Sequence, residues 1–253
     1  MLIPGWNEGA DDMRVFVNGR NGKPGFAARG FECAIFDGGK DSLTDRIDQL
    51  AQFIAGLRAA SHDDAPIALF GYSAGGVIAR GLLRARRTDA RIAAIFQLAA
   101  PNAGLATDDL AALLHRLHFS KSSIEDLDLD SEFMRWLNGT SGRWERDGGS
   151  KIWRLDNRPW VCDDGVPIVN LAGRVPHYRY RSDGVVLTES ATLDEHVPHQ
   201  FVDDRRANHL NLSGTWNPLT LVLRRWLWDD RIWPRAVDAA TAFFGGGVNS
   251  APA

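Results

Sequence analysis

The sequence contains little cysteine, little net charge and no long apolar run. Cys33 and Cys162 are the only cysteines among 253 residues. Two cysteines exclude a disulfide framework and a cysteine-based zinc motif, but they leave a single bridge open. A formal net charge of −3 gives no broad attraction for nucleic acid or for anionic lipid. We therefore expect no nucleic-acid partner.

Signals for membrane insertion and export are also missing from the printed sequence. No run approaches the about 18 consecutive apolar residues of a transmembrane helix. The first residues lack the basic and apolar regions of a signal peptide. These absences predict a cytoplasmic protein without a transmembrane segment. Because residues 1–6 begin directly with a strand-like run, a start further upstream would instead allow secretion.

The sequence does contain a hydrophobic fraction of 44% beside a charged fraction of 24%, which is enough for one large core. Short apolar runs bounded by Gly, Pro or Asp predict buried parallel strands at residues 2–4, 32–37, 67–72, 92–98 and 168–171. Apolar residues at every third or fourth position from Leu43 to Leu57 predict a helix between the second and third strands. Ser42 and Asp45 form a helix-start signal of the capping-box type.

This alternation of strand and helix predicts an α/β fold with a mostly parallel central sheet and helices on both faces. Functional loops of such a sheet gather at the carboxyl ends of the strands. We treat residues 1–253 as one domain with an insertion at residues 105–165. No strand pair is evident there, and apolar residues at helical spacing predict a helical cap. Periodicity leaves open whether this cap only packs on the core or acts as a movable lid.

Residues 71–75, GYSAG, place a serine between two glycines where a predicted strand meets a predicted helix. This is the setting of a nucleophile elbow, a sharp turn that projects the serine hydroxyl above the sheet. A Cβ at Gly71 or Gly75 would crowd the approach of the helix to the strand, and Tyr72 completes the motif. The helix N-terminus favours the negative charge that develops during acyl transfer. We predict that Ser73 is a nucleophile; the alternative is a glycine-rich turn without chemistry.

A serine nucleophile needs a base and an acid that orients the base, and in this fold both follow it in chain order. Asp183 stands in a turn beyond the strand-like residues 167–173, and His209 stands in a polar loop after a strand predicted at residues 196–202. Both loops are expected at the carboxyl edge of the sheet, so we predict that Asp183 is the acid and His209 the base. The other histidines fit less well and are His62, His115, His118, His177, His196 and His199.

These motifs resemble those of bacterial α/β-hydrolase esterases and lipases, the lipase-box family. GYSAGGVIARGLL and FQLAAPNAG look like that family's lipase box, its helix and the strand and loop that follow. DLDSEFMRWLN, NLAG, SDGVV and NHLNL continue the resemblance in order along nearly the whole chain. The resemblance implies an α/β-hydrolase fold with Ser73 as nucleophile, Asp183 as acid and His209 as base.

The resemblance also implies an oxyanion hole made by two backbone N–H groups. The family's oxyanion loop usually reads His-Gly, whereas this chain has Pro4 followed by Gly5. The matching donors are the N–H groups of Trp6 and Ala74. The alternative for Trp6 is a side chain that only lines an apolar site.

Together the motifs predict an esterase or lipase that cleaves a small-molecule carboxylic ester through an acyl-enzyme, without a metal ion or organic cofactor. Acyl chains of short to medium length are the expected substrates. A true lipase on long-chain triglyceride, a thioesterase and an acyltransferase are alternatives on the same triad. A non-enzymatic binding protein on this fold is a further rival, which the complete set of Ser, His and Asp disfavours. The sequence does not predict an oligomeric state.

Overall fold

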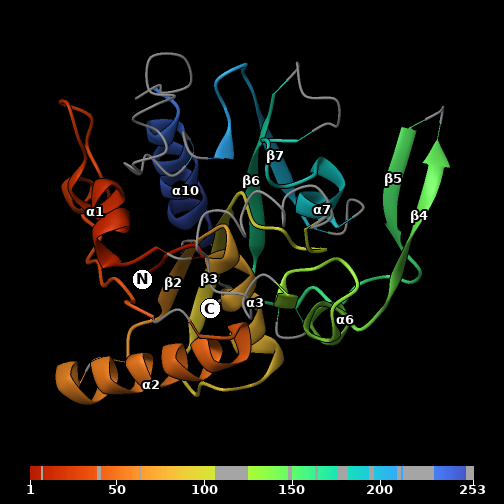
Figure 1. Cartoon of the computed structure of the whole chain (residues 1–253). Coiled ribbons are helices and arrows are strands. Elements are labelled where there is room, and N and C mark those ends of the chain that lie inside the picture. The colour runs from red at the N-terminus through yellow and green to blue at the C-terminus, as the bar shows by residue number, and fades with distance from the viewer. Residues whose placement is uncertain are drawn as a thin grey trace.

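Five parallel strands form the central sheet in the part of the chain that the computed structural model describes (Figure 1). The described residues are 1–6, 8–38, 41–62, 64–105, 125–147, 150–162, 165–175, 182–193, 197–209, 212 and 231–248. The strand order is β1-β2-β3-β6-β7. These strands are β1 (Leu2–Ile3), β2 (Ile67–Tyr72), β3 (Ile92–Leu98), β6 (Ile168–Arg174) and β7 (His199–Asp203).

Helices and one short hairpin complete the described elements. The helices are α1 (Ala10–Asn18), η1 (Ala27–Arg29), α2 (Leu43–Ser61), α3 (Ala74–Arg84), α6 (Glu132–Asn138), α7 (Thr188–Thr192) and α10 (Trp233–Val248). The hairpin consists of β4 (Gly142–Asp147) and β5 (Ser150–Leu155). The α/β fold class predicted from the sequence is thus confirmed. None of the helices in these described ranges is long and apolar enough to cross a membrane.

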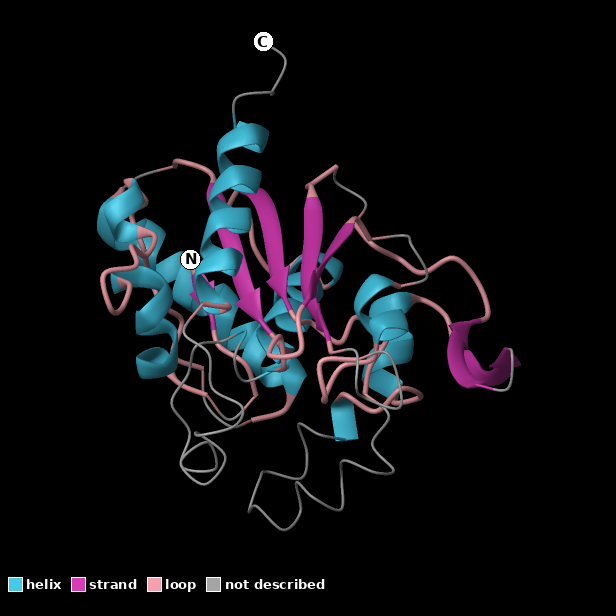
Figure 2. Ribbon diagram, turned by 90° about the horizontal axis from the view of Figure 1, so that it is seen from above, coloured by secondary structure: helices cyan, strands magenta, loops and turns pink. Residues whose placement is uncertain are grey.

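The sheet separates two apolar cores, because successive residues of a strand face opposite sides. Leu69 and Ile95 belong to the core that α2 and α3 cover, whereas their neighbours Phe70 and Phe96 belong to the core under α1 and α10. The rings of Phe70 and Phe96 stack with their centroids 5.5 Å apart. Helices therefore cover both faces of the sheet, and α10 lies along one of them (Figure 2).

One predicted strand is almost absent from the structure, whereas the predicted helix begins where expected. The strand predicted at residues 32–37 is reduced to a single parallel bridge between Leu2 and Ile35. The amide of Leu2 donates to the carbonyl of Ala34, and the amide of Phe36 donates to the carbonyl of Leu2. Because β1 has only two residues, its edge is too short to pair with all of residues 32–37. The α2 helix begins as predicted, since the hydroxyl of Ser42 accepts the amide of the third helical residue.

The insertion at residues 105–165 is not purely helical, so the expectation that it holds no strand pair is wrong. Helix α6 occupies residues at which helical spacing was evident, but β4 and β5 form an antiparallel hairpin in which Trp144 faces Trp153. Their rings pack edge to face with centroids 5.5 Å apart. This pairing buries part of two large aromatic side chains. The contact stabilises the hairpin although both strands carry many charged residues, which favour strands little. Residues 106–124 lie outside the described residues, and the lid remains a prediction.

Candidate active site

The serine of the GYSAG motif occupies a strained turn between β2 and α3. Ser73 has φ 51° and ψ −123°. Such a positive φ is strained for any residue other than glycine and costs about 1–3 kcal/mol. Serine at a helix start usually caps the helix with its hydroxyl, but Ser73 makes no such bond. Its hydroxyl is directed to another partner instead.

The two glycines of the motif are required by close backbone contacts. A Cβ at Gly71 would lie 2.5 Å from the amide nitrogen of Gly76, inside the first turn of α3. A Cβ at Gly75 would lie 2.2 Å from the carbonyl oxygen of Ile3, at the end of β1. Each distance is shorter than real Cβ contacts allow, so a side chain at either position would push α3 away from the strands.

Three of the predicted residues form one hydrogen-bonded line, although they come from three separate loops. The hydroxyl oxygen of Ser73 lies 3.0 Å from Nε2 of His209. The other ring nitrogen of His209, Nδ1, lies 2.8 Å from Oδ2 of Asp183. The side chains of His209 and Asp183 are almost completely buried. These loops follow β2, β6 and β7, so all three residues meet at the carboxyl edge of the sheet.

The carboxylate of Asp183 is held by its own turn. Its Oδ1 accepts the backbone amides of Val185 at 3.0 Å and Val186 at 2.7 Å, which leaves Oδ2 for His209. Gly173 in β6 allows this turn to approach, because a Cβ there would lie 1.8 Å from the carbonyl oxygen of Ala207 and 3.1 Å from Cβ of Asp183. The glycine of the NLAG motif therefore lets the loops of Asp183 and His209 meet.

Tyr72 has a wider role than its place in the motif indicates. Its hydroxyl donates to the backbone carbonyl of His209 at 2.9 Å, in a buried position. Its ring also lies against Gly5, where a Cβ would be 3.0 Å from Cδ1 of Tyr72. The residue next to Ser73 thus contacts both the histidine loop and the loop after β1. No sequence pattern indicates this role, because an apolar strand end does not show where a hydroxyl points.

The predicted oxyanion loop lies beside the elbow. Residues 4–6 follow β1, and the carbonyl oxygens of Ile3 and Pro4 are the atoms nearest to a Cβ built on Gly75. Ala74 is fully buried as the first residue of α3, and Trp6 packs with part of its side chain against the core of that face. The two backbone N–H groups predicted as donors therefore belong to neighbouring segments at the nucleophile.

A buried polar network that the sequence did not reveal supports the loop after β3. The guanidinium of Arg80 is fully buried and donates to the backbone carbonyl and side-chain Oδ1 of Asn102, at 3.2 and 3.1 Å. It also donates to Oδ1 of Asn138 and to the carbonyl of Trp160. Burial lowers the pKa of Arg80 to about 9. The network fastens α3 to α6 and to the segment after the hairpin.

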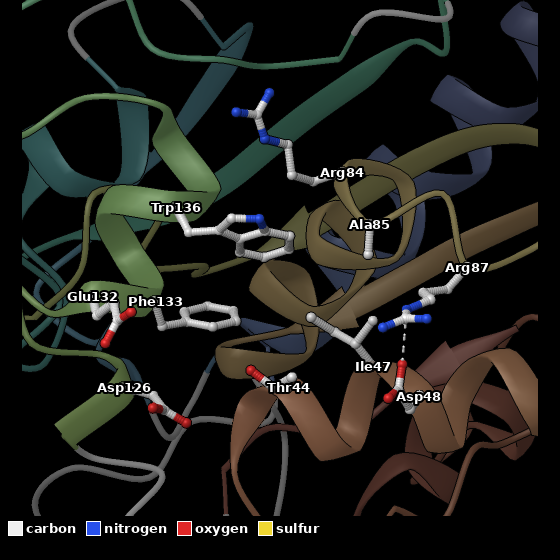
Figure 3. Close-up of a pocket in the computed structure, with 10 residues that line it drawn as sticks. All are labelled: Thr44, Ile47, Asp48, Arg84, Ala85, Arg87, Asp126, Glu132, Phe133 and Trp136. Carbon is white, nitrogen blue, oxygen red and sulfur yellow. Dashed lines mark ion pairs between the residues drawn. The ribbon is translucent and has the colours of Figure 1, made fainter.

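Two cavities in the described part of the chain lie away from the triad. One, of about 650 Å³, opens between α2, the end of α3 and α6, and Figure 3 shows Arg84 and Trp136 on its wall. The other, of about 440 Å³, lies where β2 and β3 begin and includes Ile67 and Ala93. Neither is lined by Ser73, Asp183 or His209.

The remaining histidines and the cysteines do not join the site where they are described. His62 ends α2, and His199 lies in β7 with Nδ1 3.1 Å from the carbonyl of Val197. Cys33 and Cys162 are free thiols. His115, His118, His177 and His196 lie outside the described residues.

Comparison with known proteins gives one family match and many similar structures. Residues 31–145 match the family described as Thioesterase domain. No significant match is found among curated proteins. The lipase BlEst2 of Bacillus licheniformis in its mature form is 18% identical, with 88% of this chain and 89% of that chain covered and a TM-score of 0.59.

Two further structures extend the likeness to other hydrolases. A metagenomic carboxyl esterase is 16% identical, with 97% of this chain and 74% of that chain covered and a TM-score of 0.59. A soluble variant of the monoglyceride lipase of Saccharomyces cerevisiae, solved with a substrate analogue, is 9% identical, with 97% and 85% covered and a TM-score of 0.52. At these identities the likeness concerns the fold. The parallel sheet, the serine elbow after β2 and these structural neighbours together show an α/β-hydrolase fold.

Proposed function

We propose that the protein cleaves carboxylic esters of short to medium acyl chain through an acyl-enzyme formed on Ser73. The Thioesterase-domain match and the α/β-hydrolase fold support the coarser statement, a hydrolase that acts on esters or thioesters. The observation that carries the finer proposal is the line from Ser73 Oγ through His209 to Asp183, with distances of 3.0 and 2.8 Å.

The proposed reaction begins with the histidine in its neutral form. Nδ1–H of His209 donates to Asp183, so Nε2 carries the lone pair that accepts the proton of the Ser73 hydroxyl. The serine oxygen then attacks the ester carbonyl, and the imidazolium returns its proton to the departing alkoxide. A water molecule repeats the sequence at the acyl-enzyme and releases the carboxylic acid. Asp183 stabilises the imidazolium that forms in both halves.

Negative charge on the carbonyl oxygen needs donors that are already in position. The N–H groups of Trp6 and Ala74 are the proposed donors, and the N-terminus of α3 adds a favourable dipole. A metal ion or organic cofactor has no step in this scheme. The substrate proposed is a small-molecule ester.

Thioester hydrolysis is the second candidate, because residues 31–145 match the Thioesterase domain. The same attack and the same oxyanion donors serve both reactions, which differ in whether an alkoxide or a thiolate leaves. A thiolate is the better leaving group, so it depends less on proton return from the histidine. Comparing an oxygen ester with its sulfur analogue at equal acyl length distinguishes the two activities.

The experiment that tests the proposal is labelling with a fluorophosphonate, which reacts with activated serines. We expect the wild type to be labelled at Ser73 and to hydrolyse nitrophenyl butyrate, whereas Ser73→Ala should be folded, unlabelled and without activity above background. Substantial turnover by a pure Ser73→Ala sample would refute the assignment. A wild type that is neither labelled nor active would favour the non-enzymatic binding protein.

A further inference from the structure

The loop after β1 has its peptide groups fixed by two charged side chains. Arg46 donates from Nη2 to the carbonyl of Pro4 at 3.2 Å and from Nη1 to the carbonyl of Gly5 at 3.3 Å. The amide of Gly5 donates to Oε2 of Glu8 at 3.0 Å. Both polar groups of the Pro4–Gly5 peptide and the carbonyl of the next peptide are therefore held.

Arg46 reaches this loop from the first turns of α2 and is 1% exposed. Burial lowers the pKa of Arg46 to about 10, although Glu8 and Asp41 act in the opposite direction. The guanidinium therefore remains charged at neutral pH. Burying a cation is costly unless its hydrogen bonds are satisfied, so a position that needs only packing would favour an apolar side chain.

We propose that Arg46 is a positioning residue for the oxyanion hole, which orients the N–H of Trp6 by holding the carbonyl of Gly5. This inference rests on the proposed function, because it assigns a task to the Trp6 donor. The carbonyl of Gly5 and the N–H of Trp6 belong to one planar trans peptide, in which they point in opposite directions. Fixing the carbonyl on Arg46 therefore fixes the direction of the N–H.

The charge of Arg46 adds to this geometric effect. A cation at the carbonyl oxygen draws electron density toward that oxygen, which polarises the peptide and strengthens its N–H as a donor. Gly5 also lies between Glu8 and the ring of Tyr72, because a Cβ there would be 2.8 Å from Glu8 Oε2 and 3.0 Å from Tyr72 Cδ1. The loop is thus held from α2, from its own carboxylate and from the residue before the nucleophile.

The test compares Arg46→Gln and Arg46→Lys with the wild type. We expect Arg46→Gln to lower kcat for nitrophenyl butyrate by about 30- to 100-fold, somewhat less than the loss of an oxyanion donor itself, with KM changed by less than about threefold. Inhibition by butylboronic acid, which forms a tetrahedral adduct on the serine, should weaken by a similar factor. Arg46→Lys should lose less, because the cation remains while one of two donors is lost.

Matched variants of Arg80 separate this role from general destabilisation. Arg80→Gln and Arg80→Lys also remove a buried guanidinium, but one that is bonded to Asn102, Asn138 and Trp160. We expect them to lower Tm while kcat of the folded protein stays within about threefold. A kcat in both Arg46 variants within that same range, with an active wild type, would overturn the role of Arg46 and leave the proposed function intact. An inactive wild type would overturn both.

Discussion

His209 is joined to Asp183 twice, once through the backbone and once through the side chain. The amide of His209 donates to the carbonyl of Asp183 at 2.9 Å, and Nδ1 of the same residue lies 2.8 Å from the Asp183 carboxylate. The two contacts fix both the position of the histidine loop and the rotation of the imidazole ring. Asp183 therefore anchors the backbone of His209 through its main-chain carbonyl and orients the imidazole through its carboxylate.

Replacing Asp183 with Asn should reverse the tautomer of His209. Because Oδ1 accepts the amides of Val185 and Val186, the oxygen of an asparagine would take that place and its NH₂ group would face Nδ1. The ring proton would then sit on Nε2, and a protonated Nε2 cannot accept the proton of the Ser73 hydroxyl. We expect kcat to fall by about 10³- to 10⁴-fold with little change in Tm.

Asp203→Asn is the control for this change, because Asp203 pairs with Arg174 on the surface. Its kcat should stay within about twofold of the wild type, since exposed ion pairs contribute little. Equal losses in the two variants, measured by initial rates on nitrophenyl butyrate, would show that Asp183 has no special position in the reaction.

A second prediction concerns which imidazole acts as base. His209→Ala should reduce kcat as severely as Ser73→Ala, because members of one catalytic unit fail together. His199→Ala should retain most activity, since Nδ1 of His199 contacts the carbonyl of Val197 and not the triad. His196→Ala should also retain most activity. If the loss followed His199 or His196 in place of His209, the base would be misassigned.

Gly173 tests how closely the acid and base loops must approach. Gly173→Ala would place a Cβ 1.8 Å from the carbonyl oxygen of Ala207, so the backbone must move and unfolding should become easier by at least about 2 kcal/mol. Activity should fall with stability, because the added Cβ would also lie 3.1 Å from Cβ of Asp183. Thermal unfolding and initial rates on the same samples measure both effects.

Gly56→Ala is the control for Gly173→Ala and should stabilise the protein instead of destabilising it. Gly56 is exposed inside α2, and a Cβ there meets nothing within 4 Å. Alanine should stabilise the helix by about 0.5–1 kcal/mol without a change in kcat. A Gly173→Ala protein as stable and active as Gly56→Ala would contradict the crowding at β6.

Acyl-chain preference is the fourth prediction. On nitrophenyl esters of increasing length, kcat/KM should rise by up to about fourfold per methylene, which corresponds to about 0.8 kcal/mol of burial, and then break where the pocket ends. The insertion at residues 105–165 is expected to set that break. A sharp rise in rate above the solubility limit of long-chain esters would instead favour a true lipase whose insertion acts as a lid.

Strands buried on both faces were the part of the fold that the sequence predicted best. Residues 67–72 and 92–98 became β2 and β3 with unchanged bounds, because continuous apolar runs ending in Gly, Asp or Pro have few other stable arrangements. The nine residues of α1 gave no comparable signal, since Met13 and Phe16 are its only buried residues. Short helices of this kind depend on tertiary packing more than on their own sequence.

The hairpin was missed although a signal for it exists. Residues 142–155 place one tryptophan on each side of an Asp-Gly-Gly sequence, and Asp-Gly and Gly-Gly both favour a turn between two strands. Arg46 also had a signal. It lies three residues after Leu43 and four before Leu50, so helical spacing places it on the buried face of α2. What no spacing could reveal is that its partners would be two carbonyls in a loop after β1.

The position of α10 has a consequence for the order in which the protein matures. This helix comes after every described strand, yet Trp233 and Phe244 belong to the core formed by Phe16, Phe70 and Phe96. During synthesis the aromatic face of β2 and β3 emerges long before the helix that covers it. In a nascent chain this apolar surface therefore stays exposed to solvent until α10 has left the ribosome. Interrupted translation would yield an aggregation-prone fragment that already contains the complete serine elbow.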